Sequence, residues 1–196
     1  SFLGSMFKYW YITPVVFSDS EWKLYSNKNL DDYYTPKSNI KLTIETPKNY
    51  SVSSELNLKR TTNKLGKNKF YLEGKRRTDT RLNISRKPFI EHKIGSLNVI
   101  SDSFSSHEPL AMEINSFNKV IDFLSDKIGY YPHKNLMISR VDLKKNPIYG
   151  LNILPGFLNP FSKEFEYELT IAKNLIKLYL DQYLNMDPRK DHWLKS

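Results

Sequence analysis

The sequence predicts an α+β protein, and three observations support this. Residues 1–104 contain short segments of alternating apolar and polar residues separated by turn signals about every ten residues. Residues 105–196 contain two long stretches of helical periodicity, and 39% of the 196 residues are hydrophobic, which is enough for a packed core. We therefore expect an antiparallel, β-sandwich-like N-terminal domain over 1–104 and an α/β domain over 105–196. The serine-rich stretch at 101–109 marks the expected boundary.

The N-terminal part begins with an aromatic, β-favouring stretch at 7–17, interrupted by Pro14. The clearest strand follows, because Ile40, Leu42 and Ile44 alternate with polar residues before a turn at 47–49. The pattern then continues as short strands within 50–105, with a polar turn at 63–68. The basic triplet at 75–77 follows Gly74 and is interpreted as the solvated end of a hairpin.

The C-terminal part begins with a helix, predicted from apolar residues at helical spacing and ended by Gly129 and Pro132. The periodic residues are Ile114, Phe117, Val120, Ile121, Leu124 and Ile128. Two strands are predicted next, at 135–141 and 147–154. A second long helix follows, in which Leu169, Ala172, Ile176, Leu180 and Tyr183 recur at the spacing of an amphipathic core face.

Composition limits the classes of function. The net charge of +9 permits an acidic partner, although a general bias toward lysine explains it more simply, and we expect no nucleic acid partner. The chain has no cysteine, which excludes disulfides and thiolate metal sites, and its four histidines have no ligand spacing. The pair Asp31 and Asp32, followed by Tyr33 and Tyr34, is either an acidic site or, more simply, a helix cap or solvated turn.

The chemistry-bearing stretch is 171–196. Ile171 and Ala172 precede Lys173 and Asn174, Lys177 follows one helical turn after Lys173, and the later pair Trp193 and Leu194 leads to Ser196. This spacing resembles the motif of the gluzincin zinc aminopeptidases, of the aminopeptidase N type, in which I-A-H-E-x-x-H is followed at a fixed distance by W-L and a glutamate. The resemblance suggests a bacterial member and implies that the second domain is the opening of a thermolysin-like α/β domain.

The resemblance places Lys173 and Lys177 at the two histidine positions, Asn174 at the general base and Ser196 at the third ligand. In an active motif, two imidazoles at this spacing bind one zinc ion from the same helical face. A protonated lysine has no lone pair for a metal, and asparagine cannot accept the proton of a metal-bound water. We therefore expect no zinc, no other cofactor and no catalytic residues here. The alternative interpretation is an ordinary amphipathic core helix.

The family's substrate-binding edge strand carries G-x-M-E-N, and the nearest match here is Gly150, Leu151, Asn152, Ile153 and Leu154, with Ile153 at the glutamate position. The expected peptide-binding edge strand is made by Tyr149, Gly150, Leu151, Asn152 and Ile153. An apolar residue replaces the glutamate that holds the substrate's amino group. Pairing between the strand edge and an extended peptide does not need that side chain. The segment is therefore either a peptide-binding edge strand or simply a core strand.

The resulting hypothesis is a catalytically degenerate homologue of zinc aminopeptidases that binds peptide or protein, or serves as a scaffold. One alternative is an active aminopeptidase whose ligands lie elsewhere or beyond this chain. Another is a basic module for nucleic acid or an anionic surface. We expect the sequence to be part of a larger protein, so its compartment and any membrane association stay open.

Overall fold

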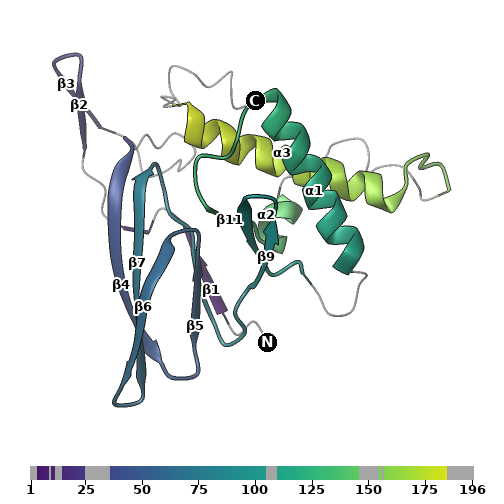
Figure 1. The fold of residues 1–196 in the computed structure, drawn as a ribbon. Coiled ribbons are helices and arrows are strands. Elements are labelled where there is room, and N and C mark those ends of the chain that lie inside the picture. The colour runs from purple at the N-terminus through teal and green to yellow at the C-terminus, as the bar shows by residue number, and fades with distance from the viewer. Residues whose placement is uncertain are drawn as a thin grey trace. The chain divides into compact units, whose positions relative to one another are not determined.

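The computed structural model describes residues 4–8, 10–11, 15–24, 36–104, 110–145, 155 and 157–184. The chain divides into two compact units, one formed by 1–88 with 181–196 and the other by 89–180. Strands dominate the purple-to-teal part of the chain and helices the green-to-yellow part (Figure 1). The fold is thus a strand-rich mixture of antiparallel sheets and helices, as the α+β prediction requires. The expected domain boundary at 104–105 stays a prediction.

The described strands of the first unit form three antiparallel sheets. The largest has the order β4-β7-β6, made by β4 (Ser38–Pro47), β7 (Lys67–Arg77) and β6 (Asn57–Lys64). A second has the order β1-β8-β5, made by β1 (Gly4–Phe7), β8 (Leu82–Ser85) and β5 (Ser51–Ser54). The third is a hairpin of β2 (Val16–Ser18) and β3 (Glu21–Lys23).

Strand β4 confirms the predicted alternation. Ile40, Leu42 and Ile44 face a small apolar core, while the intervening residues are exposed. The turn between β6 and β7 is tighter than predicted, because both strands extend into the polar stretch and leave only Leu65 and Gly66 between them. Both of these residues have positive φ (50° and 74°), as a two-residue hairpin turn requires.

The second unit is built on a three-stranded sheet. Strand β10 (Leu97–Ser101) pairs antiparallel with β9 (Ile90–Ile94) and parallel with β11 (Asn135–Met137). Helix α1 (Leu110–Lys127) lies in the connection between the two parallel strands, which makes a βαβ unit. It confirms the predicted helix, with Phe117, Val120, Ile121 and Leu124 buried.

The strand predicted at 135–141 is shorter than expected, because helix α2 (Arg140–Lys145) begins within it. Ser139 Oγ accepts a hydrogen bond from the Asp142 backbone at 3.1 Å, and Asp142 Oδ2 accepts one from the Ser139 backbone at 3.0 Å. This reciprocal pair is a capping box, which satisfies backbone donors at the start of a helix. The S-x-x-D spacing was readable in the sequence.

Helix α3 (Lys163–Tyr183) completes the described structure, and its residues up to 180 belong to the second unit. An apolar core joins this helix to α1 and the sheet. No helix in the described residues is long and apolar enough to cross a membrane.

Candidate functional site

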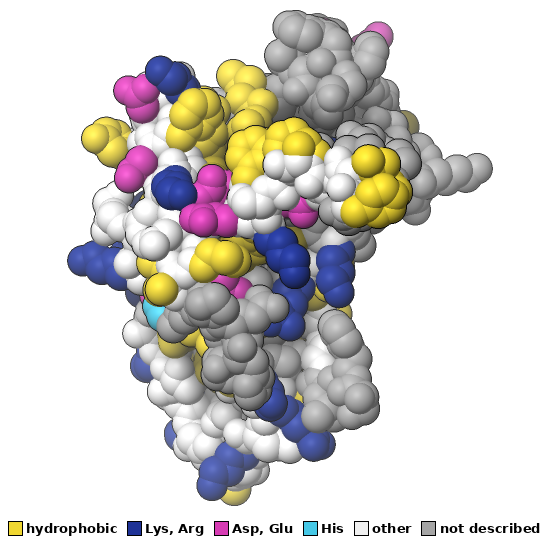
Figure 2. All heavy atoms as spheres, turned by 90° about the vertical axis from the view of Figure 1, so that its right-hand side faces the viewer, with side chains coloured by type: hydrophobic (Ala, Val, Ile, Leu, Met, Phe, Trp, Pro, Cys, Tyr) yellow, Lys and Arg dark blue, Asp and Glu magenta, His cyan; other side chains and the backbone are white. Residues whose placement is uncertain are grey.

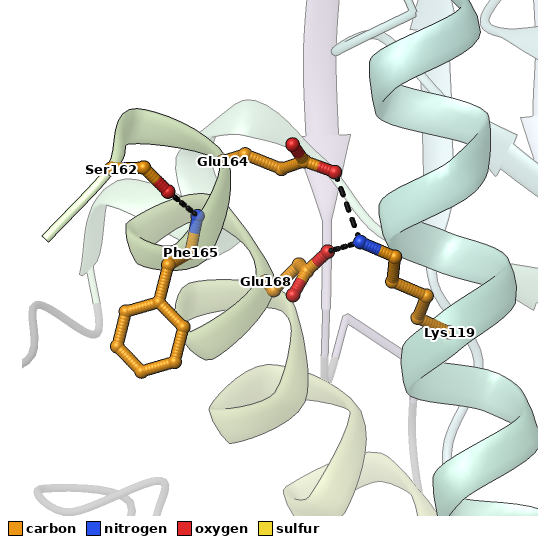
Figure 3. Close-up of polar contacts among 5 residues, drawn as sticks. All are labelled: Lys119, Ser162, Glu164, Phe165 and Glu168. Atoms are coloured by element: carbon orange, nitrogen blue, oxygen red, sulfur yellow. Dashed lines mark hydrogen bonds and ion pairs between the residues drawn. The ribbon is translucent and has the colours of Figure 1, made fainter.

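The first turn of α3 is fixed by capping and by ion pairs to α1 (Figure 3). Ser162 caps the helix, since its Oγ accepts a hydrogen bond from the Phe165 backbone at 3.2 Å. Lys119 of α1 donates to Glu164 at 3.0 Å and to Glu168 at 2.8 Å. These bonds to Glu168 and Glu164 hold the pKa of Lys119 above its usual value. The two helices are therefore tied together in a defined register.

The buried face of α3 differs from the one expected. Ile171, Leu175, Leu178 and Tyr179 are buried in the core of the second unit. The predicted core residues lie on neighbouring positions of the helix: Leu169, Ala172, Ile176 and Leu180 are only partly buried, and Tyr183 is exposed. Ala172 and Ile176 still pack against this core, so periodicity predicted the helix correctly but placed the centre of its buried face about one position away.

The two motif lysines lie on the exposed surface of α3. Lys173 and Lys177 are both exposed and stand four residues apart, so they project from the helix one turn from each other. Asn174 is instead buried, and its Nδ2 donates to the Thr170 carbonyl oxygen at 2.8 Å. The Asn174 side chain thus bonds to the backbone of its own helix.

Positions 173, 174 and 177 of α3 carry two ammonium groups and one amide. An ammonium group repels a dication rather than binding it, and a hydrogen-bonded amide does not accept a proton. Lys173 and Lys177 place positive charge at two exposed positions one helical turn apart. Ammonium groups at this spacing are suitable for contacts with carboxylates or carbonyl oxygens of another molecule.

The remaining predicted site residues lie outside the described residues. These are Ser196, the Trp193–Leu194 pair, the acidic and aromatic stretch 31–34, and the proposed edge strand with Tyr149, Gly150, Leu151, Asn152 and Ile153.

Metal-binding side chains do not gather within the described residues, where no group of three or more His, Asp or Glu side chains could hold an ion. Two of the four histidines are described, and both contact aromatic rings. His92 packs edge-on against Phe104 with ring centroids 4.8 Å apart, and His133 packs against Tyr131 at 5.7 Å. These contacts are those of packed side chains.

The first unit contains a buried charged cluster that sequence analysis missed. We call Glu55, Arg77, Asp79 and Arg81 the charged cluster. Arg77 is 1% exposed, and its Nη2 donates to the Glu55 backbone oxygen at 3.0 Å. The Glu55 Oε1 atom accepts a hydrogen bond from the Arg81 backbone at 3.1 Å. The prediction that the basic triplet 75–77 is a solvated hairpin end is therefore wrong for Arg77.

The carboxyl groups of the charged cluster are electrostatically perturbed. Burial raises the pKa of Glu55, against the attraction of Arg81 and Arg77. Burial, together with repulsion by Glu55, raises the pKa of Asp79 to about 6, while Lys8 and Arg81 act in the opposite direction. Each of the two carboxyls therefore favours its protonated form more than an exposed carboxyl does.

Comparison with known proteins gives a partial structural likeness. No protein-family model and no curated protein matches the sequence. Solved structures that match include a two-domain M1 zinc metallopeptidase mutant bound to L-arginine and an M1 zinc metallopeptidase from Deinococcus radiodurans, each at 14% identity and TM-score 0.37. Another, from the same organism and bound to a Tyr-Ser-Ala substrate, matches at 13% identity and TM-score 0.39.

In each case the match covers 53% of this chain and 26% of the solved chain. These three solved structures are M1 zinc metallopeptidases, matched over part of the fold and at low identity.

Proposed function

We propose that this chain is a non-catalytic relative of the gluzincin aminopeptidases that binds peptide or protein, or serves as a scaffold. The observation that carries the proposal is the chemistry of α3. Lys173 and Lys177 occupy the two histidine positions on an exposed surface, and Asn174 at the base position is bonded to Thr170. A helix with these residues keeps the spacing of the zinc motif without its ligands, so neither zinc binding nor peptide hydrolysis is expected.

The proposal extends to the parts of the fold that the motif implies. The second domain would be the opening of a thermolysin-like α/β domain, running from α1 through β11 to α3. Tyr149, Gly150, Leu151, Asn152 and Ile153 would form an edge strand that pairs with an extended peptide through main-chain hydrogen bonds. Lys173 and Lys177 on α3 would offer charge to the bound chain.

The proposal is tested by restoring the motif. Wild-type protein and the quadruple variant K173H/N174E/K177H/S196E are loaded with zinc, dialysed and analysed by mass spectrometry, and leucine anilide hydrolysis is assayed on the same samples. The wild type should retain below about a tenth of an equivalent of zinc, and the variant about one equivalent.

Two results would contradict the proposal. Stoichiometric zinc in the wild type, with hydrolysis, would show that ligands elsewhere make an active enzyme. Failure of a folded quadruple variant to bind zinc would show that the motif alignment is wrong, since histidines at these positions should then be able to share one ion. A triple variant with native Asn174 serves as a control, because it should bind zinc without gaining hydrolysis.

A further inference from the structure

The β2–β3 hairpin exposes an apolar face. Phe17 and Trp22 are paired across the two strands, so both side chains lie on one face, with ring centroids 5.0 Å apart. They are 57% and 64% exposed. Val15 and Leu24, which directly flank the two strands, are 47% and 72% exposed. We call these four residues the hairpin face.

The opposite side of the hairpin is different. Val16 pairs with Lys23, and both are only partly exposed. Lys23 lies 3.7 Å from the Asp19 carboxylate and 3.6 Å from that of Glu21. The turn residues Asp19 and Ser20 both have positive φ, 53° and 63°, which matches the twist of a two-residue hairpin. The turn therefore fixes the register that places Phe17 beside Trp22.

Exposed hydrophobic side chains occur in several places on the face drawn in Figure 2, and single ones need no explanation. The hairpin differs because four such residues lie together on an element that pairs with no other described strand. A two-stranded hairpin is only marginally stable in water by itself. Covering the hairpin face would therefore stabilise the hairpin as well as remove apolar surface from water.

The distribution of net charge along the sequence indicates which kind of molecule covers the hairpin face. Residues 1–88 hold 17 of the 30 basic residues and 8 of the 21 acidic ones, which gives a net charge of +9. Residues 89–180 hold ten of each, a net charge of zero. The whole excess of positive charge thus belongs to the stretch of chain that carries the hairpin. An occupant of the hairpin face should be apolar where it meets the side chains and anionic around them.

We propose that the first unit docks on an anionic lipid bilayer, with the hairpin face lying in the headgroup region. Trp and Phe favour this interface, and basic residues near an anionic surface add to binding. Val15 and Leu24 favour lipid over nucleic acid, since aliphatic side chains gain nothing from base stacking. Asp19 in the turn and Glu21 at the start of β3 are acidic, so the hairpin lies flat on the bilayer rather than inserting its tip.

The test is vesicle flotation of the full chain, with phosphatidylcholine vesicles and with vesicles that contain about one third phosphatidylglycerol. Binding should require the anionic lipid and should fall steeply between about 0.05 M and about 0.5 M salt. The variant F17S/W22S should bind at least about tenfold more weakly. A matched control, F157S/L158S, removes two residues that are 86% and 57% exposed in the second unit, whose net charge is zero, and it should bind like the wild type.

A second readout follows Trp22 alone. In the variant W10F/W193F, Trp22 is the remaining tryptophan, and its emission should shift to the blue when anionic vesicles are added. Circular dichroism checks that each variant is folded.

Several outcomes would overturn the proposal. These are no binding to anionic vesicles at low salt, no emission shift, equal binding by folded F17S/W22S, or an equal loss in F157S/L158S. Binding of single-stranded DNA that F17S/W22S loses, without binding to vesicles, would assign the hairpin face to nucleic acid instead.

Discussion

The two units differ in the side chains that they bury: the second buries a large apolar cluster, whereas the first buries a small apolar cluster and charged residues. The second unit buries a large apolar cluster in which α3 contributes Ile171, Leu175, Leu178 and Tyr179. Among the described residues, the apolar cluster of the first unit has four buried members, Ile44, Leu56, Leu72 and Leu82, and the same unit buries Glu55, Arg77 and Arg81 of the charged cluster. Apolar burial is insensitive to pH, whereas buried carboxyls and guanidiniums depend on one another's ionisation. The two units should therefore respond differently to mutation and to pH.

The largest expected effect is the loss of one partner from the charged cluster. Arg77→Ala removes a buried guanidinium beside Glu55, and the free energy of unfolding of the first unit should fall by about 3 to 5 kcal/mol. The loss should shrink at low pH, where the carboxyls are protonated. Urea unfolding gives the overall effect, and hydrogen exchange read on peptides from each unit assigns it.

Leu175→Ala is the matched change in the second unit, where it empties space in an apolar core. It should cost about 2 to 5 kcal/mol, and this cost should not vary between pH 5 and pH 7. If Arg77→Ala shows the same flat dependence on pH, the charged cluster does not act as an ionic unit.

The pH dependence of the wild type should come mainly from the first unit. Asp79 has a pKa of about 6 in the folded protein against an ordinary value of 3.8. A carboxyl whose folded pKa is raised binds its proton more tightly in the folded state, so the stability of this unit should rise as pH falls from 7 toward 4. The shift corresponds to about 3 kcal/mol at most.

The variant Asp79→Asn, which keeps the shape and removes the titration, should flatten this profile. Hydrogen exchange at pH 5 and 7, corrected for the intrinsic rate, is the measurement. Stability that falls between pH 7 and pH 5 would give the opposite sign and would mean that Asp79 is held ionised.

Substitutions at positions 173, 174 and 177 of helix α3 should have smaller effects on stability. Asn174→Ala removes a buried side chain and its bond to Thr170, and it should cost about 1 kcal/mol. Lys173→Ala and Lys177→Ala change exposed positions and should each alter stability by less than about 1 kcal/mol. Thermal unfolding compares the three. A loss at either lysine well above that at Asn174 would show that the lysine has a structural role in this unit.

How much of the fold could be predicted depended on whether burial follows a simple period. In β4 and α1 it does, and Ile40, Leu42 and Phe117 were placed correctly from the sequence. In α3 apolar residues occupy neighbouring positions around the helix, and packing in the core of the second unit buries Leu175 more completely than the predicted Ala172 and Ile176. Motif spacing located Lys173 and Lys177 on this helix, but their exposure, and the burial of Asn174 between them, depend on packing that the sequence does not display.

The burial of Arg77 could not be predicted, because local sequence presents it as the third of three basic residues. Its position depends on Gly74. A side chain at Gly74 would place its Cβ 2.4 Å from Leu56 Cδ2 and 3.0 Å from Arg77 Cγ. The missing side chain thus makes the space in which Arg77 packs beside Leu56, and that is a property of the folded sheet rather than of the local sequence.

The smallest predicted effect concerns the turn between β6 and β7, where an apolar residue occupies a conformation that suits glycine or asparagine. Leu65 has φ of 50° and is fully exposed, so its side chain contributes no burial to offset the backbone strain. Leu65→Asn should stabilise the first unit by about 0.5 to 1 kcal/mol, because asparagine tolerates the left-handed region and Asn-Gly is the preferred pair in this turn. Leu58→Asn is the control, since Leu58 is also exposed but lies within β6. There asparagine lowers β propensity, and stability should fall. A gain at both positions, measured by urea unfolding, would mean that removing exposed apolar surface, rather than relieving the turn, stabilises the unit.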